Sequence, residues 1–271
     1  MIKFFFRYFI IIFLSILISL YLFEFYQNIY LGDNNINKKA KILWKSEKIV
    51  YDKRTKIQAF IDIKEKNSNL VSTIVPKTNV LFPKGELLPL SGISNSLTLH
   101  CNENGYYSLF ESDRYGFNNP DEEWNKKYID YLIVGDSYAM GECVNRPYDI
   151  SSVLRKLLKK NVLNLAYSSN GPFIEYAVLR EYLDQNVENI LWFFYEGNDL
   201  QDLSDTMHSA HLNRYIHDLN YKQNLKLKQL DIDILTRENL REDINYFIER
   251  DQKSKKYKIL RFIRLDKTKK L

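Results

Sequence analysis

The sequence predicts an α/β fold in which a parallel sheet is covered by helices on both faces, carried on an N-terminal membrane anchor. Apolar, strand-like runs at 128–134, 162–166 and 189–195 alternate with segments of helical periodicity, as parallel sheets require. Each run leads into a loop of small and polar residues. An uncharged apolar stretch also opens the chain, which is typical of a membrane span.

Composition favours a folded protein and argues against nucleic-acid binding. The chain has 271 residues, of which 45% are hydrophobic and 14% aromatic, enough to bury a core. Its net charge of +5 is uneven, because residues 251–271 hold nine Lys or Arg against two Asp. The rest of the chain therefore carries a net charge of −2. No basic face for a nucleic acid is evident on the predicted domain.

The N-terminus has the features of a single membrane span. Lys3 and Arg7 precede an uncharged run at 8–23. Phe4–Phe6 extend the apolar stretch, and Glu24 ends it. No Ala-x-Ala-like cleavage site follows, so an uncleaved anchor is favoured over a signal peptide, and a buried soluble helix comes third. Because positive charges precede the span, we expect a cytoplasmic N-terminus and a body on the periplasmic side of the inner membrane.

The expected organisation is an anchor at 1–26, a stalk or juxtamembrane segment at 27–95 and a partial α/β domain at 96–271. The stalk is charged and weakly periodic, and three prolines interrupt regular structure near its end. Within the domain, a short strand is expected at 106–111. Turns are expected at 113–124, which contains Gly116, Asn118-Asn119 and Pro120.

Helices are expected between and after the core strands. The segment 150–160 is helical because its apolar residues fall near helical spacing; these are Val153, Leu154, Leu157 and Leu158. Further helices are expected at 174–183 and 219–247. The basic segment 253–270 contains interleaved apolar residues. It either contacts a membrane surface or covers a part of the domain that the chain lacks, and the second interpretation is preferred.

Two cysteines, Cys101 and Cys143, allow a single disulfide. Cys143 follows the turn after the first core strand, and Cys101 lies in the approach to the sheet. The pair either forms a disulfide, as an oxidising compartment permits, or consists of two small buried side chains. The sequence leaves both possibilities open.

The loops after the three core strands contain the candidate site. Gly135-Asp136-Ser137 places a serine on a glycine-opened turn, where it is held rigidly and still exposed. The second loop, 168–172, is small and polar, and the third contains Asn198. In open α/β sheets, sites form at the carboxyl edge. In a flavodoxin-like order, with the first strand between the other two, Ser137 lies beside Asn198, and the second loop lies on the other side.

These groups suit acyl transfer, which needs a nucleophile and several donors aimed at the oxyanion. Ser137 supplies a hydroxyl and its own backbone N–H. The side chain of Asn198 supplies a second donor. A backbone N–H from the loop at 169–171 supplies a third.

The arrangement resembles the SGNH, or GDSL-type, hydrolase superfamily over about residues 100–245. The run into Gly135-Asp136-Ser137 resembles its first block, which implies that Ser137 is the nucleophile. Residues 162–171 resemble the second block, where the oxyanion glycine aligns best with Ser169, and Gly171 is the fallback. Glu196-Gly197-Asn198-Asp199 resembles the third block, which implies that Asn198 donates to the oxyanion. The resemblance implies a three-layer flavodoxin-like fold.

The family's fourth block, an Asp-x-x-His that supplies the general base, has no counterpart in the expected place. Asp205-Thr206-Met207-His208 matches it literally, but too soon after the third block and in an expected helix. We therefore expect His208 to lie on an exposed helix face. The chain resembles the N-terminal part of an SGNH protein, cut after its third core strand and the following helices.

The segments 101–105 and 115–120 resemble a membrane-anchored bacterial subgroup of this superfamily. This resemblance implies an ester hydrolase or O-acyltransferase acting on acylated envelope or surface carbohydrate. The alternative is an inactive membrane-anchored remnant or binding module that lacks the base. The expected partners are the membrane and an ester substrate, and neither a metal nor a cofactor is implied.

Overall fold

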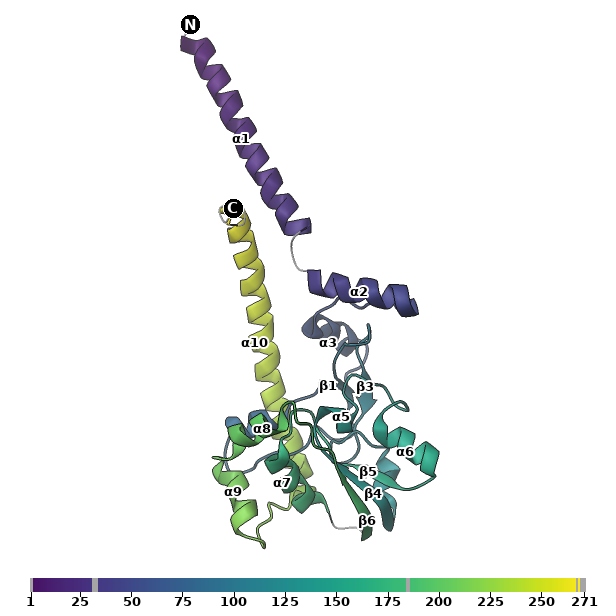
Figure 1. Ribbon diagram of the computed structural model, residues 1–271. Coiled ribbons are helices and arrows are strands. Elements are labelled where there is room, and N and C mark those ends of the chain that lie inside the picture. Colours follow the sequence, from purple (N-terminus) through teal and green to yellow (C-terminus); the bar gives the residue numbers. More distant parts are fainter. Residues whose placement is uncertain (1, 31–33, 184–185, 267, 269–271) are drawn as a thin grey trace. The chain divides into compact units, whose positions relative to one another are not determined.

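The computed structural model describes residues 2–30, 34–183, 186–266 and 268 (Figure 1). The chain divides into two compact units. Unit 1 comprises Met1–Lys53 and Ile244–Leu271, and unit 2 comprises Arg54–Asp243. The long helix α10 (Gln229–Ile263) contributes residues to both units.

Among the described residues of unit 1, one helix is long and apolar enough to cross a membrane. Helix α1 (Ile2–Tyr30) includes the stretch Phe6–Gln27, which has 22 residues and a mean hydropathy of 2.3. Most of its apolar side chains are exposed. Helix α2 (Asn34–Glu47) follows it. The expectation of an N-terminal apolar helix is thus confirmed, while its role as an anchor remains a prediction.

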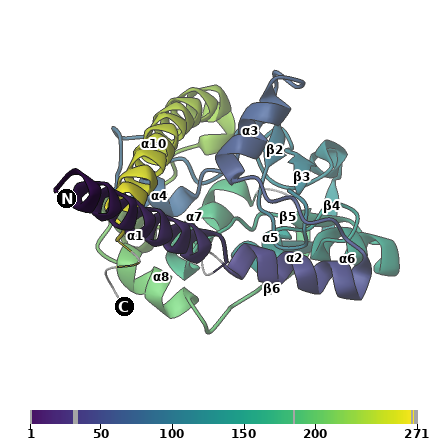
Figure 2. The ribbon, with the colours of Figure 1, turned by 90° about the horizontal axis from the view of Figure 1, so that it is seen from above.

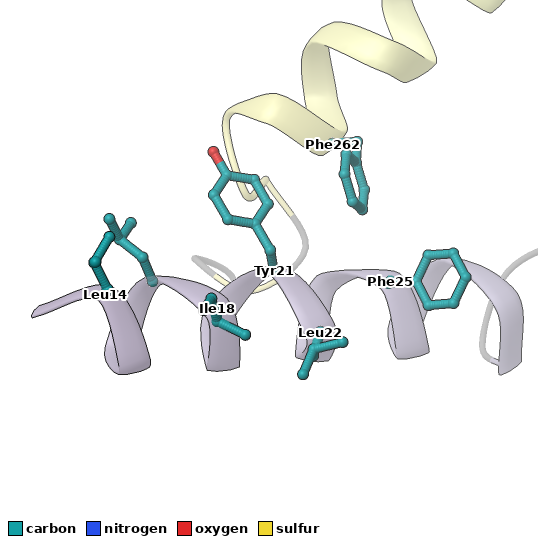
Figure 3. A pocket seen from close by; sticks show the side chains of 7 residues that line it. Leu14, Ile18, Tyr21, Leu22, Phe25 and Phe262 are labelled. Carbon is teal, nitrogen blue, oxygen red and sulfur yellow. The ribbon is translucent and has the colours of Figure 1, made fainter. Parts of the chain in front are cut away.

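The end of α10 packs against the second half of α1 within unit 1 (Figure 3). The hydroxyl of Tyr21 donates to the carbonyl of Ile263 at 3.0 Å, and its ring lies 5.8 Å from that of Phe262. Glu24, which is only 1% exposed, accepts bonds from the backbone N–H and the hydroxyl of Thr268, at 2.8 and 2.7 Å. The carboxylate at the end of the apolar run therefore has polar partners, as a buried charged group requires.

The core of unit 2 is a parallel sheet of three strands. These are β4 (Tyr128–Val134), β5 (Val162–Asn164) and β6 (Asn186–Trp192). The order is β5-β4-β6, and β4 pairs in parallel with both neighbours. The first strand is thus central, and the expected mixed α/β fold with a parallel sheet is confirmed.

Helices cover this sheet. Figures 1 and 2 show α6 (Ile150–Leu158) and α7 (Pro172–Tyr182) on opposite sides of the strands. Helix α6 begins where the Asp149 side chain accepts the N–H of Ser152, a typical N-cap. The short α5 (Ser137–Met140) follows β4, and α8 (Asp199–Thr206) and α9 (Ala210–His217) follow β6. The sheet's side chains that pack between the layers are fully buried; they include Ile129, Leu132, Ile133, Val134, Val162 and Leu163.

The third core strand lies three residues earlier than the sequence predicts. It was expected at 189–195, and β6 spans Asn186–Trp192. The reason is its partner: β4 ends at Val134, which is opposite Trp192, so the ladder stops there although the sequence stays apolar. Phe194 and Tyr195 are then exposed. Among the described residues no strand pairs with the outer edge of β6.

A second, smaller sheet also belongs to unit 2. Its strands are β1 (Leu70–Ser72), β2 (Leu97–Leu99) and β3 (Leu109–Glu111), and β2 pairs in parallel with β1 and antiparallel with β3. β3 falls within the strand expected at 106–111. The helices α3 (Lys56–Lys64) and α4 (Pro76–Leu81) lie in the same unit, which begins at Arg54. Two 3₁₀ turns complete the described elements, η1 (Asp121–Asn125) and η2 (Leu225–Lys228).

The turn-rich segment at 113–124 is organised by one buried carboxylate. Asp113 accepts from the backbone N–H groups of Tyr115 and Phe117, at 2.9 and 3.0 Å. It also accepts from the side chains of Asn119 and Trp124, both at 2.8 Å. Burial raises the pKa of Asp113 to about 6, and these four bonds oppose the rise.

Candidate active site

Ser137 lies where the sequence predicts, on the turn that follows the central strand. The backbone of Gly135 passes so close to its neighbours that a Cβ there would lie 2.9 Å from the Cβ of Ala139 and 3.0 Å from that of Phe193. Only glycine fits this close approach. Asp136 then caps α5, and Ser137 is its first residue and is half-buried. The serine is therefore rigidly placed at the carboxyl edge of the sheet.

Asp136 joins Ser137 to Asn198. The Ser137 hydroxyl donates to Oδ2 of Asp136 at 3.4 Å, and Nδ2 of Asn198 donates to the same oxygen at 3.4 Å. Both bonds are long. A shorter bond, of 2.8 Å, joins Nδ2 of Asn198 to Asp202. The structure thus brings together the two residues that the sequence places after the first and third strands.

The loop after β5 contacts Asp202, the partner of Asn198, through Gly171. A Cβ on Gly171 would lie 2.6 Å from the Cβ of Asp202, the residue that holds Asn198. Ser169 is half-buried and has φ +59°, in the left-handed region that favours glycine. No hydrogen bond between Ser169 and Ser137 or Asn198 occurs in the described part of the chain.

Carboxylates surround this edge of the sheet. Glu175, in the first turn of α7, is buried and accepts from the Trp192 indole at 2.5 Å. Its burial raises its pKa to about 8; the Trp192 bond opposes this, while the nearby carboxylates Asp199, Asp136 and Asp202 add to it. Glu175 is therefore a neutral acid at pH 7. Sequence reasoning did not identify it, although an acidic residue three positions after Pro172, the first residue of the helix, was a visible signal.

A second polar cluster lies beside the Ser169 loop. Nε2 of the buried His100 is 3.1 Å from the hydroxyl of Ser168, which is 3.1 Å from a carboxylate oxygen of Glu142. Burial lowers the pKa of His100 to about 3, and the ammonium of Lys56 adds to this effect. His100 is thus a neutral imidazole whose partners are Ser168 and Glu142, and it makes no hydrogen bond to Ser137.

The cysteines form a disulfide beside this cluster. Cys101 and Cys143 are bonded, with their Cα atoms 4.9 Å apart. The possible metal ligands of His100, Cys101 and Glu142 lie within 4.8 Å of one another. A disulfide sulfur is a poor ligand, since metals bind the thiolate. Only one imidazole and one carboxylate remain there, fewer than a structural zinc site uses.

The other histidines also lie apart from the nucleophile. His208 is exposed, as expected, but it lies in the turn between α8 and α9 rather than on a helix face. The carboxylate of Asp205 accepts from Lys77 at 2.7 Å and from Gln201 at 2.6 Å rather than from His208. The literal Asp-x-x-His match is therefore not a hydrogen-bonded pair. Within the described ranges, Ser137 has no histidine partner.

No protein-family model, curated protein or solved structure matches this chain. The candidate site therefore stands on its own residues and geometry. Those place a serine, an asparagine side chain and a small-residue loop together at the carboxyl edge of a parallel sheet.

Proposed function

We propose that this chain is a membrane-anchored serine ester hydrolase or O-acyltransferase of the SGNH type, acting on acylated envelope or surface carbohydrate. The observation that carries the proposal is the convergence of Ser137 and Asn198 on Asp136. Ser169 adds support, because its positive φ is the conformation expected where the family has its oxyanion glycine.

In this proposal the Ser137 hydroxyl attacks the ester carbonyl and forms a tetrahedral intermediate. Its oxyanion accepts N–H bonds from the backbone of Ser137, the backbone of Ser169 and the amide of Asn198. Asn198 has two amide hydrogens and keeps its 2.8 Å bond to Asp202 while exchanging the 3.4 Å bond to Asp136 for the oxyanion. Collapse of the intermediate breaks the C–O bond to the sugar, whose oxygen leaves as a hydroxyl with the proton that the Ser137 hydroxyl has lost, and an acyl-enzyme remains.

The acyl-enzyme reacts either with water, which completes hydrolysis, or with a second hydroxyl, which completes transfer. We place the body on the extracytoplasmic side, because positive charges precede the apolar helix α1. An acylated carbohydrate of the envelope is accessible there. The Cys101–Cys143 disulfide agrees with such an oxidising space.

A second candidate function is a membrane-anchored binding module without catalysis. The specific observation that favours it is that no described histidine contacts Ser137, so the hydroxyl lacks the base that activates a serine. The imidazole of the buried His100 contacts Ser168 and Glu142 instead.

Labelling with a fluorophosphonate separates the two functions. The full chain in detergent should form a covalent adduct, and Ser137→Ala should abolish it together with any p-nitrophenyl acetate turnover. Ser204→Ala, at an exposed position of α8, is the matched control and should keep both. A wild-type chain that remains unlabelled favours the binding module. Turnover that survives Ser137→Ala contradicts the nucleophile, and turnover lost in His208→Ala would identify that residue as the base.

A further inference from the structure

Two exposed tyrosines flank the candidate nucleophile. Tyr138 directly follows Ser137 and is 63% exposed, and Tyr195 precedes Asn198 by three residues and is 44% exposed. Their ring centroids are 5.2 Å apart, with an interplanar angle of 63°. Large aromatic side chains usually bury their surface, so a paired, exposed set beside a nucleophile points to a ligand.

Tyr195 is held in place by its neighbours. Its ring lies over the backbone of Gly197, where a Cβ would be 2.6 Å from the ring atoms Cε1 and Cζ. Its backbone N–H donates to the Asp199 carboxylate at 2.6 Å, and its carbonyl accepts the N–H of Asp199 at 3.0 Å. Glycine at 197 thus permits the ring to fold back towards Tyr138. A ring fixed in this way loses little freedom when a ligand binds.

The chemistry of the pair indicates the class of ligand. Among the described residues, no hydrogen-bond partner occupies the hydroxyl of Tyr138 or of Tyr195. Each ring therefore offers an apolar face and a free polar tip. A pyranose ring has the matching form, since its C–H face stacks on an aromatic ring and its hydroxyls exchange hydrogen bonds with phenols.

Charge argues for a neutral ligand. The carboxylate of Asp136 lies at the site, and the exposed Glu196 is adjacent in sequence to Tyr195, whereas Asp202 is paired with the ammonium of Lys77. The carboxylates of Asp136 and Glu196 repel phosphate headgroups and acidic polymers. We propose that Tyr138 and Tyr195 form a subsite for a neutral pyranose ring of the glycan. This subsite rests on the proposed function, and it would hold the sugar whose ester Ser137 attacks.

Binding is measured on the full chain in detergent with Ser137→Ala, so that no probe is consumed. The probes are cellotetraose, chitotetraose and mannotetraose, and their affinities are measured by isothermal titration calorimetry. At least one should bind, and adding Tyr138→Ala or Tyr195→Ala should weaken it by about tenfold, as loss of a stacking contact implies. Tyr148→Ala removes a 78% exposed tyrosine outside the pair and should leave affinity unchanged.

Tyr138→Phe and Tyr195→Phe keep the aromatic rings and control for loss of binding that is caused by misfolding of the alanine variants. Each should bind the glycan more tightly than the corresponding alanine variant. Absence of binding to all three probes, or equal affinities with and without the tyrosines, would overturn the subsite. Labelling of wild-type Ser137 without glycan binding rejects the subsite and leaves the hydrolase. Tyrosine-dependent binding without labelling supports the subsite and rejects the hydrolase.

Discussion

Removal of the Cys101–Cys143 disulfide should lower the stability of unit 2 by about 4 kcal/mol. The two cysteines are separated by 42 residues. In the chain-entropy description, closing a loop of this length removes about 13 cal/mol/K from the unfolded chain, which is about 4 kcal/mol at 25 °C. Since small domains are stable by about 5–15 kcal/mol, this is a large share of the total.

Urea unfolding of the full chain in detergent, followed by tryptophan fluorescence, measures this free energy. Trp124 is 7% exposed in unit 2 and should report its unfolding, while Trp44 is already 53% exposed. The free energy of unfolding of the oxidised wild type should exceed that of the reduced wild type by about 4 kcal/mol. The double variant Cys101→Ala/Cys143→Ala is the control, because a reductant should leave its unfolding curve unchanged.

Two results would refute this reasoning. One is a difference of less than about 1 kcal/mol between the oxidised and reduced wild type, well below the loop-closure value. The other is maleimide labelling of either cysteine before any reductant is added, which would mean that the disulfide is absent.

Three further predictions concern the site and the anchor. Asn198→Ala should lower kcat by roughly a hundred- to thousandfold with little change in KM, and an effect on KM alone would assign Asn198 to substrate binding. Glu175 has a pKa of about 8 when folded against an ordinary 4.5, so its stabilising contribution is complete below pH 4.5 and is lost as pH rises through 8. Glu175→Gln should therefore flatten the decline in urea-unfolding free energy between pH 5 and 8, and an unchanged pH profile would contradict the assignment. A reporter fused after Leu271 should be active only if it functions in the periplasm, whereas a cytoplasm-only signal or a mature chain starting near residue 25 would count against the anchor.

Local sequence patterns predicted the core of the sheet well. The strand at 128–134 coincides with β4, because a central strand buried on both faces gives a continuous apolar run and glycine marks its end. The strand at 189–195 was placed too late, because Phe193, Phe194 and Tyr195 continue the apolar run after the ladder with β4 has stopped. Apolar composition identifies a strand, but its partner determines where it ends.

Contacts between distant segments escaped prediction. The cluster of His100, Ser168 and Glu142 joins loops that are 26 to 68 residues apart, and no local spacing signals it. Local spacing likewise gives no signal for the hydrogen bonds between Asp113 and its four donors. The neighbourhood of Ser137 and Asn198 was predictable for a different reason: both lie in segments that follow adjacent strands of one parallel sheet, so topology alone places them at one edge.

Unit 1 is built from both ends of the chain, so unit 2 is an insertion with two covalent connections, at Lys53 and Asp243. Each end of unit 2 is therefore joined covalently to unit 1. A single backbone cut within Arg54–Asp243 would leave both fragments of unit 2 attached to a part of unit 1.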